Sequence, residues 1–199
     1  MRKLINVLVF VALTLVNTNS FSYNSDPKAF INELVNDAIT TLSNKNISIA
    51  EKNKKIKTIA LQNVDIEALG MYTLGAVRKD LDQAVLEKYK NLFEKYFLKS
   101  LTSRLTDYSS QKFEVLGAEQ KSEAYTIVSS KIAKSSSSPE IKIDWRVYTK
   151  DPAKPLIRDL IVEGLSLAKT QKEEFASILN SNNNDISVLF TKLEEFIKK

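Results

Sequence analysis

The sequence contains no histidine and no cysteine. Histidine is the commonest general base and transition-metal ligand, and cysteine supplies both the thiolate nucleophile and the disulfide bond. Their absence removes most hydrolytic and metal-dependent mechanisms, and it means that stability must come from a packed core. Glycine is scarce as well, with 4 residues in 199, and none has the spacing of a phosphate-binding loop.

Long hydrophobic runs are lacking, except near the start of the chain. Arg2 and Lys3 precede an apolar run from Leu4 to Val16, and the small residues Ser20 and Ser22 follow it. The run is shorter than the ~20 residues that a membrane-spanning helix needs, and this order is typical of a cleaved secretory signal. We predict a signal peptide at residues 1–22 and one exported domain at 23–199; the alternative is an uncleaved membrane anchor.

Positive charge is only in modest excess. The net charge of +5 falls to +3 when Arg2 and Lys3 are removed with the leader. The densest basic run lies between Lys52 and Lys57 and contains no aromatic residue, whereas nucleic-acid-binding surfaces interleave basic and aromatic side chains. We therefore expect no nucleic-acid partner and interpret the run as a solvated helix face. The alternative is a docking surface for an acidic partner or for anionic headgroups.

Helix signals occupy the first half of the chain and its end. The strongest is the apolar and aromatic repeat from Leu86 to Tyr108, which has the period of a long helix. Capping residues mark the starts of the other helices, because their side chains accept hydrogen bonds from the first free backbone N–H groups. These starts are expected at Asp26-Pro27, Ser48 to Glu51, Asp65, Thr170 to Glu173 and Asp185.

A period of two replaces the helical period in the middle of the chain. Apolar residues from Ile141 to Val147 alternate with Lys142, Asp144, Arg146 and Tyr148, and Val128, Ser130 and Ile132 alternate in the same way. Further strands are expected at Phe113 to Leu116 and at Ile157 to Leu167, the second with a bend or bulge at Glu163-Gly164. This order predicts an α+β fold, with helices packed on one face of a curved antiparallel sheet and a helical C-terminus.

Several of these segments follow one another in an order that belongs to a known family. They are Asp65 to Leu74-Gly75, Val77-Arg78, the long helix, Trp145-Arg146, and the run Val162-Glu163-Gly164-Leu165-Ser166-Leu167. In this respect the chain resembles the MlaC family, the toluene-tolerance periplasmic carriers of phospholipid. Val77 departs from the family's usual Trp, and Thr170-Gln171-Lys172 departs from its usual Asn-Tyr-Arg.

The resemblance implies a conical shape related to the NTF2-like fold, a periplasmic location and a diacyl phospholipid as cargo. It implies two docking partners, an outer-membrane lipoprotein complex and an inner-membrane MCE-domain protein attached to an ABC transporter. A protein of this kind is a carrier and not an enzyme, and it needs no cofactor. The Lys-rich second helix is a candidate docking surface.

The candidate binding residues are apolar side chains of the long helix and of the alternating sheet face. We expect them to form a lipid cavity or the core next to it. Arg146 and Arg158 are candidates for contact with a lipid phosphate, because a guanidinium matches phosphate geometry. The alternative is that they pair with Asp144 and Asp159. The apolar candidates are Phe93, Phe97, Leu101, Val128, Ile132, Ile143, Trp145, Val147, Leu160 and Val162.

Two other functions fit the same sequence. An exported polypeptide-binding, chaperone-like module would also need an apolar groove. A small exported enzyme of NTF2-like shape could use Asp144 and Tyr148, although the absence of histidine argues against it. Retention of lipid through purification would separate a carrier from both.

Overall fold

The computed structural model describes residues 23–105, 112–134 and 139–199. The expected signal peptide, the expected end of the long helix at Tyr108 and the serine run Ser135 to Ser138 lie outside the described residues. Within them, no helix combines the length and the hydrophobicity needed to cross a bilayer.

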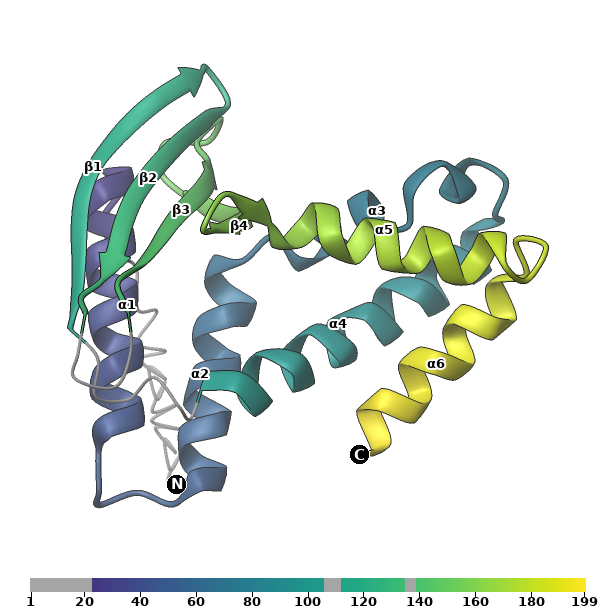
Figure 1. Ribbon diagram of the computed structural model, residues 1–199, viewed down its shortest axis with the longest axis horizontal. Helices are drawn as coiled ribbons and strands as arrows, with labels where there is room; N and C mark the ends of the chain where they lie inside the picture. The colour runs from purple at the N-terminus through teal and green to yellow at the C-terminus, as the bar shows by residue number, and fades with distance from the viewer. Residues whose placement is uncertain (1–22, 106–111, 135–138) are drawn as a thin grey trace, which may run out of the picture.

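The described chain has four helices and a 3-10 turn, then a sheet, then two more helices (Figure 1). The strands pair antiparallel with their sequence neighbours, in the order β1-β2-β3-β4-β5. This arrangement confirms the expected α+β class and the helical C-terminus. The helices are α1 Pro27–Ser43, α2 Ile49–Asn63, α3 Ile66–Thr73, η1 Gly75–Lys79, α4 Gln83–Leu105, α5 Leu167–Asn180 and α6 Ile186–Lys198. The strands are β1 Phe113–Ser122, β2 Tyr125–Ile132, β3 Ile141–Tyr148, β4 Leu156–Val162 and β5 Leu165–Ser166.

Most helix starts are where the capping residues place them. The Asp26 carboxylate accepts a hydrogen bond from the Ala29 N–H at 2.8 Å, and Pro27 occupies the first turn. Ser48 and Glu51 form a complete capping box at the start of α2. Asp65 and Asp185 cap α3 and α6 in the same way. These starts are local features, and the prediction of each is confirmed.

Two expected boundaries were wrong, and one expected bend was right. Helix α5 begins at Leu167, with Ser166 as its cap, and Thr170 lies inside the helix. The bend predicted at Glu163-Gly164 is confirmed: a turn divides the expected strand Ile157 to Leu167 there, with φ values of 50° and 82° in the left-handed region. Strand β1 continues through Gly117 to Ser122, because a register shift at this point lets the ladder with β2 resume.

One hydrophobic core lies between α1 and the sheet. The apolar residues of one sheet face and of the buried face of α1 interlock here, and this explains the alternation seen in the sequence. Its most buried members are Phe30, Ile31, Leu34, Val128, Val147 and Ile157.

A second core joins helices α2 to α6. The aromatic side chains of α4 form its centre: Phe93 is 2% exposed and packs against the ring of Phe175 from α5 at a centroid distance of 6.4 Å. Tyr89 is completely buried, and burial raises the pKa of its hydroxyl. Figure 1 shows this helical part beside the sheet, with α2 between α1 and α4.

Gly70 allows α3 to lie against α4. A Cβ atom at this position would lie 2.8 Å from Cδ1 of Phe93, closer than carbon atoms pack. We expect Gly70→Ala to lower the free energy of unfolding by up to about 2 kcal/mol, because overpacking costs about 1–3 kcal/mol and helix propensity returns only about 1 kcal/mol. Chemical denaturation measures the change.

Gly117→Ala is the matched control for that substitution. A Cβ atom there would meet nothing within 4 Å, so we expect a change within about 0.5 kcal/mol. Equal effects of the two substitutions would contradict the close approach of α3 to α4.

The capping box of α2 should make stability depend on pH. The backbone N–H and the hydroxyl of Ser48 donate to Glu51 and hold the pKa of its carboxyl below 4.5. Because the folded pKa is the lower one, this stabilisation is present above the unfolded value and is lost as the pH falls through the folded value. Stability measured from about pH 5 to about pH 3 should therefore fall more steeply for the wild type than for Glu51→Gln. Parallel curves would show that the capping box is not formed in solution.

Candidate functional site

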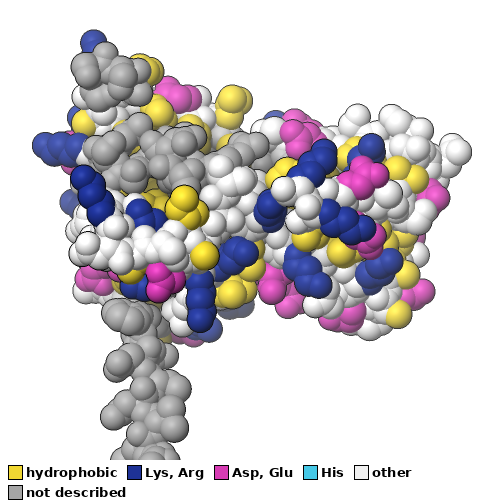
Figure 2. Space-filling view, turned by 90° about the horizontal axis from the view of Figure 1, so that it is seen from below, with side chains coloured by type: hydrophobic (Ala, Val, Ile, Leu, Met, Phe, Trp, Pro, Cys, Tyr) yellow, Lys and Arg dark blue, Asp and Glu magenta, His cyan; other side chains and the backbone are white. Residues whose placement is uncertain are grey.

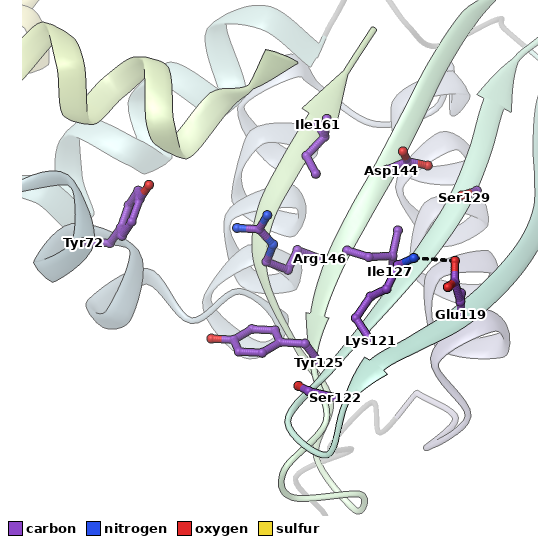
Figure 3. A pocket seen from close by; sticks show the side chains of 10 residues that line it. All are labelled: Tyr72, Glu119, Lys121, Ser122, Tyr125, Ile127, Ser129, Asp144, Arg146 and Ile161. Atoms are coloured by element: carbon purple, nitrogen blue, oxygen red, sulfur yellow. Dashed lines mark ion pairs between the residues drawn. The ribbon is translucent and has the colours of Figure 1, made fainter. Parts of the chain in front are cut away.

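A pocket of about 720 Å³ lies on the sheet face that points away from α1 (Figure 3). Strands β1 to β4 form one wall, and Tyr72 of α3 stands across the opening from them. The volume is within the range of small-molecule sites. The strand residues of the wall are Glu119, Lys121, Ser122, Tyr125, Ile127, Ser129, Asp144, Arg146 and Ile161.

The strand register brings these side chains together. Ile127 pairs with Arg146, and Asp144 lies between Ser129 on β2 and Ile161 on β4. Because alternate residues of a strand point to opposite faces, all five share the face opposite the α1 core. The polar half of the alternation, which the sequence pattern marks as exposed, is therefore a wall of the pocket.

The charged side chains of the pocket differ in how they are paired. Lys121 pairs with Glu119 at 2.6 Å. Arg146 lies 3.6 Å from Asp159, whose side chain is 1% exposed, whereas the Arg146 side chain is 43% exposed. The Asp159 carboxylate also accepts hydrogen bonds from the Ser166 hydroxyl and the Ala168 N–H. The buried carboxylate of Asp159 thus orients Arg146, and the Arg146 guanidinium faces the pocket.

Arg158 connects the sheet to α3 at one edge of the pocket. Its Nε and Nη2 atoms both lie 2.7 Å from Oδ2 of Asp65, the residue that caps α3. It also donates to the hydroxyl of Tyr125 and stacks on the ring of Tyr148, 3.5 Å from the centroid. Burial disfavours its charge, but these hydrogen bonds more than compensate and raise the pKa of Arg158. We call these residues, Asp65, Tyr125, Tyr148 and Arg158, the sheet–helix joint.

Tyr72 is held from the other side. The ammonium of Lys172 in α5 lies 5.0 Å from the centre of its ring, and Tyr72 remains 42% exposed. Gln171, the preceding residue, accepts a hydrogen bond from the Tyr96 hydroxyl at 2.6 Å. Lys172 therefore contacts Tyr72 of the pocket wall. It belongs to Thr170-Gln171-Lys172, where the sequence departs from the usual family residues.

The apolar candidates from the sequence divide between the two cores. Phe93, Phe97 and Leu101 lie in the helical core. Val128, Trp145, Val147 and Leu160 lie in the core between α1 and the sheet, and the register puts Ile132, Ile143 and Val162 on that same sheet face. The structure does not bring the two groups together, and the pocket wall contains none of the ten. Their contact with lipid remains a prediction.

The two arginine candidates have different environments. Arg146 lines the pocket, whereas Arg158 is engaged by the sheet–helix joint and is not part of the lining. The alternative, pairing of the two arginines with Asp144 and Asp159, holds in part: Arg146 pairs with Asp159, whereas Arg158 pairs with Asp65. A register shift in the ladder between β3 and β4 places Arg158 beside Tyr148, where it also contacts Asp65. Asp159 is therefore left to pair with Arg146 across the ladder.

Several pocket residues were missed by sequence reasoning. Ile127 and Ile161 occupy the strand positions that alternation assigns to solvent. Examining these outward-facing positions for apolar residues would have found both. Tyr72 carries no such signal, because only the packing of α3 brings it to the pocket.

The chain is thus a small α+β protein with a pocket that offers both charged and apolar groups, which suits an amphiphilic ligand. The family model described as MlaC protein matches residues 32–195, and the chain belongs to this family.

Comparison with solved structures gives a similar protein. It is a phospholipid-binding protein from Ralstonia solanacearum, solved in complex with a phospholipid. The two share 16% sequence identity with a TM-score of 0.71, and the match covers 88% of this chain and 97% of that one. This likeness supports the fold. Comparison with curated protein sequences finds no match.

The sheet–helix joint can be tested by separating its two roles at Asp65. Asp65→Asn keeps a capping oxygen for α3 but removes the charge that Arg158 faces, whereas Asp65→Ala removes both. We expect Asp65→Asn to lower the free energy of unfolding by about 1.5–3 kcal/mol, because a charged hydrogen bond is lost, and Asp65→Ala to lower it by about 1 kcal/mol more. Denaturant titration measures both. A harmless Asp65→Asn would contradict the joint.

Proposed function

We propose that this protein binds a phospholipid and carries it through the periplasm, as part of an intermembrane transport system linked to an ABC transporter. The observation that supports it most is the pocket, where the Arg146 guanidinium and the apolar side chains of Ile127 and Ile161 share one wall. Membership of the MlaC family and the lipid-bound Ralstonia protein of the same fold support the choice of ligand. Residues 23–199 would perform this function as one domain after removal of the leader.

The physical task explains why such a protein is needed. Exposing ~30 methylenes to water would cost on the order of 20 kcal/mol, at about 0.8 kcal/mol each, so free diffusion of the lipid is negligible. A carrier must cover the acyl chains and leave the headgroup hydrated. Transfer from bilayer to protein then changes the free energy little, and the direction of transport must come from the docking partners. We propose an outer-membrane lipoprotein complex and an inner-membrane MCE-domain protein as these partners.

Within the pocket, we assign the phosphate to Arg146. Its guanidinium can contact a phosphate through two parallel N–H groups, which gives a strong and directional interaction. The acyl chains would start along Ile127, Ile161 and the ring of Tyr72. The ten apolar candidates remain candidates for contact farther along the chains, where the helical core and the sheet would have to separate to admit them.

The basic surface of α2 is a candidate docking surface for one of these partners. Lys52 donates to the carbonyl oxygen of Leu42, so its ammonium is part of the fold. Lys54 and Lys55 are exposed and remain available to an acidic partner. On the face shown in Figure 2, basic and acidic side chains are interspersed, with hydrophobic side chains among them.

Mass spectrometry of the purified mature protein tests the proposal. We expect a phospholipid to stay bound in native spectra and to disappear after organic extraction. Ile161→Asp puts a charge on the apolar part of the pocket wall, so it should reduce the lipid-bound fraction at least about tenfold, because a buried unpaired charge is costly.

Ile49→Asp is the control for the same change in side chain. Ile49 is 67% exposed at the start of α2 and is absent from the pocket lining, so this variant should retain lipid. A wild-type protein that is free of lipid and takes none from vesicles would overturn the proposal. Retention of peptide in place of lipid would favour a polypeptide-binding module.

A further inference from the structure

The carboxylate of Asp144 is the charged group of the pocket that lacks a partner. Within the described parts of the chain it makes no ion pair and no hydrogen bond, although it faces the pocket from the middle of β3. Lys121 is paired with Glu119, and Arg146 is paired with Asp159. The pocket therefore presents one carboxylate whose charge no neighbouring side chain offsets directly.

Asp144 and Arg146 lie on the same strand face, two residues apart. Such residues are separated by about 6.6–6.8 Å along a strand. The Arg146 guanidinium makes no hydrogen bond with a described residue, so its N–H groups can bind a ligand. Next to Asp144 on β2, the Ser129 hydroxyl also has no hydrogen-bond partner among the described residues. The sheet thus offers an anion-binding group and a cation-binding group at a fixed spacing.

This spacing suits a zwitterion. In a phosphoethanolamine headgroup, four covalent bonds join phosphorus to the ammonium nitrogen and span at most about 5 Å. With the phosphate on Arg146, the ammonium can reach the Asp144 carboxylate and the Ser129 hydroxyl by ordinary hydrogen bonds. A phosphoglycerol headgroup would place a neutral hydroxyl there instead and would leave Asp144 without its counter-ion.

We infer that Asp144 selects phospholipids whose headgroup ends in a primary ammonium over anionic phospholipids. This inference rests on the proposed function, because it names the headgroup held in the same pocket. A quaternary ammonium fits less well. It would need open aromatic faces, and the ring of Tyr72 already carries Lys172 while that of Tyr125 lies near Arg158.

A competition experiment with the full mature protein tests the inference. The lipid-free protein is incubated with vesicles that contain equal amounts of phosphatidylethanolamine and phosphatidylglycerol with identical acyl chains. The protein is then separated from the vesicles, and its bound lipids are extracted and quantified by mass spectrometry. We expect the wild type to be enriched about 1.4-fold to fivefold in phosphatidylethanolamine, the range for one partly exposed ion pair.

Substitutions at Asp144 should change this ratio without abolishing binding. Asp144→Asn is expected to bring the ratio close to that of the vesicles, and Asp144→Lys to reverse the preference toward phosphatidylglycerol. Glu140→Gln is the matched control, because it removes one negative charge near the start of β3 from a residue outside the pocket lining that pairs with Lys131. Glu140→Gln should keep the wild-type ratio.

The outcomes distinguish failure of the headgroup preference from failure of phospholipid binding itself. If the wild type binds both lipids in the vesicle ratio, phospholipid binding holds but the role of Asp144 is wrong. If Glu140→Gln changes the ratio as much as Asp144→Asn, the preference comes from overall charge and not from this site, which also overturns the inference. If no lipid binds at all, the proposed function fails together with the inference.

Discussion

The contact between Arg158 and Asp65 determines how the two halves of this protein meet. One half is the sheet with α1, and the other is the bundle of α2 to α6, and each has its own hydrophobic core. At the point where α2 gives way to α3, Val64 pairs with Ile157 of β4 and the Asp65 N–H donates to the Ile157 carbonyl. The ion pair then fixes the angle of α3 against the sheet. Because Tyr72 is on α3, this angle sets how far it stands from the strand wall.

The mixed polar and apolar lining of the pocket comes from the sheet face that does not contribute to the core. The apolar face is filled by α1, so the opposite face keeps polar groups and scattered isoleucines. Such a surface is poorly suited to a protein interior but well suited to a ligand with a charged end and an apolar end. Arg146 shows the principle: its neighbour Asp159 is buried and fully bonded, which orients the guanidinium without neutralising it by close contact.

Features that depend on neighbouring residues were predictable from the sequence, whereas contacts between residues far apart in the sequence were not. The caps at Asp26, Ser48 and Asp185 depend on residues within three positions, and alternation in β2 and β3 identifies the core face correctly. The start of α5 was misplaced because Ser166 and Thr170 both suit a cap. The choice is made by Asp159, which accepts from the Ala168 N–H and belongs to another strand. Arg158 was assigned the wrong partner because Asp65 is 93 residues away in sequence. Tyr72 was missed for the same kind of reason.

The division into two cores has a consequence for spectroscopy. The chain has one tryptophan, Trp145, and it lies in the core between α1 and the sheet, where its indole N–H donates to the Ser130 hydroxyl. Intrinsic tryptophan fluorescence therefore reports the sheet half alone. The helical core contains tyrosines and phenylalanines, so its loosening would leave the tryptophan emission unchanged and would be followed by circular dichroism at helical wavelengths. Agreement or disagreement between the two signals would show whether the halves unfold as one unit.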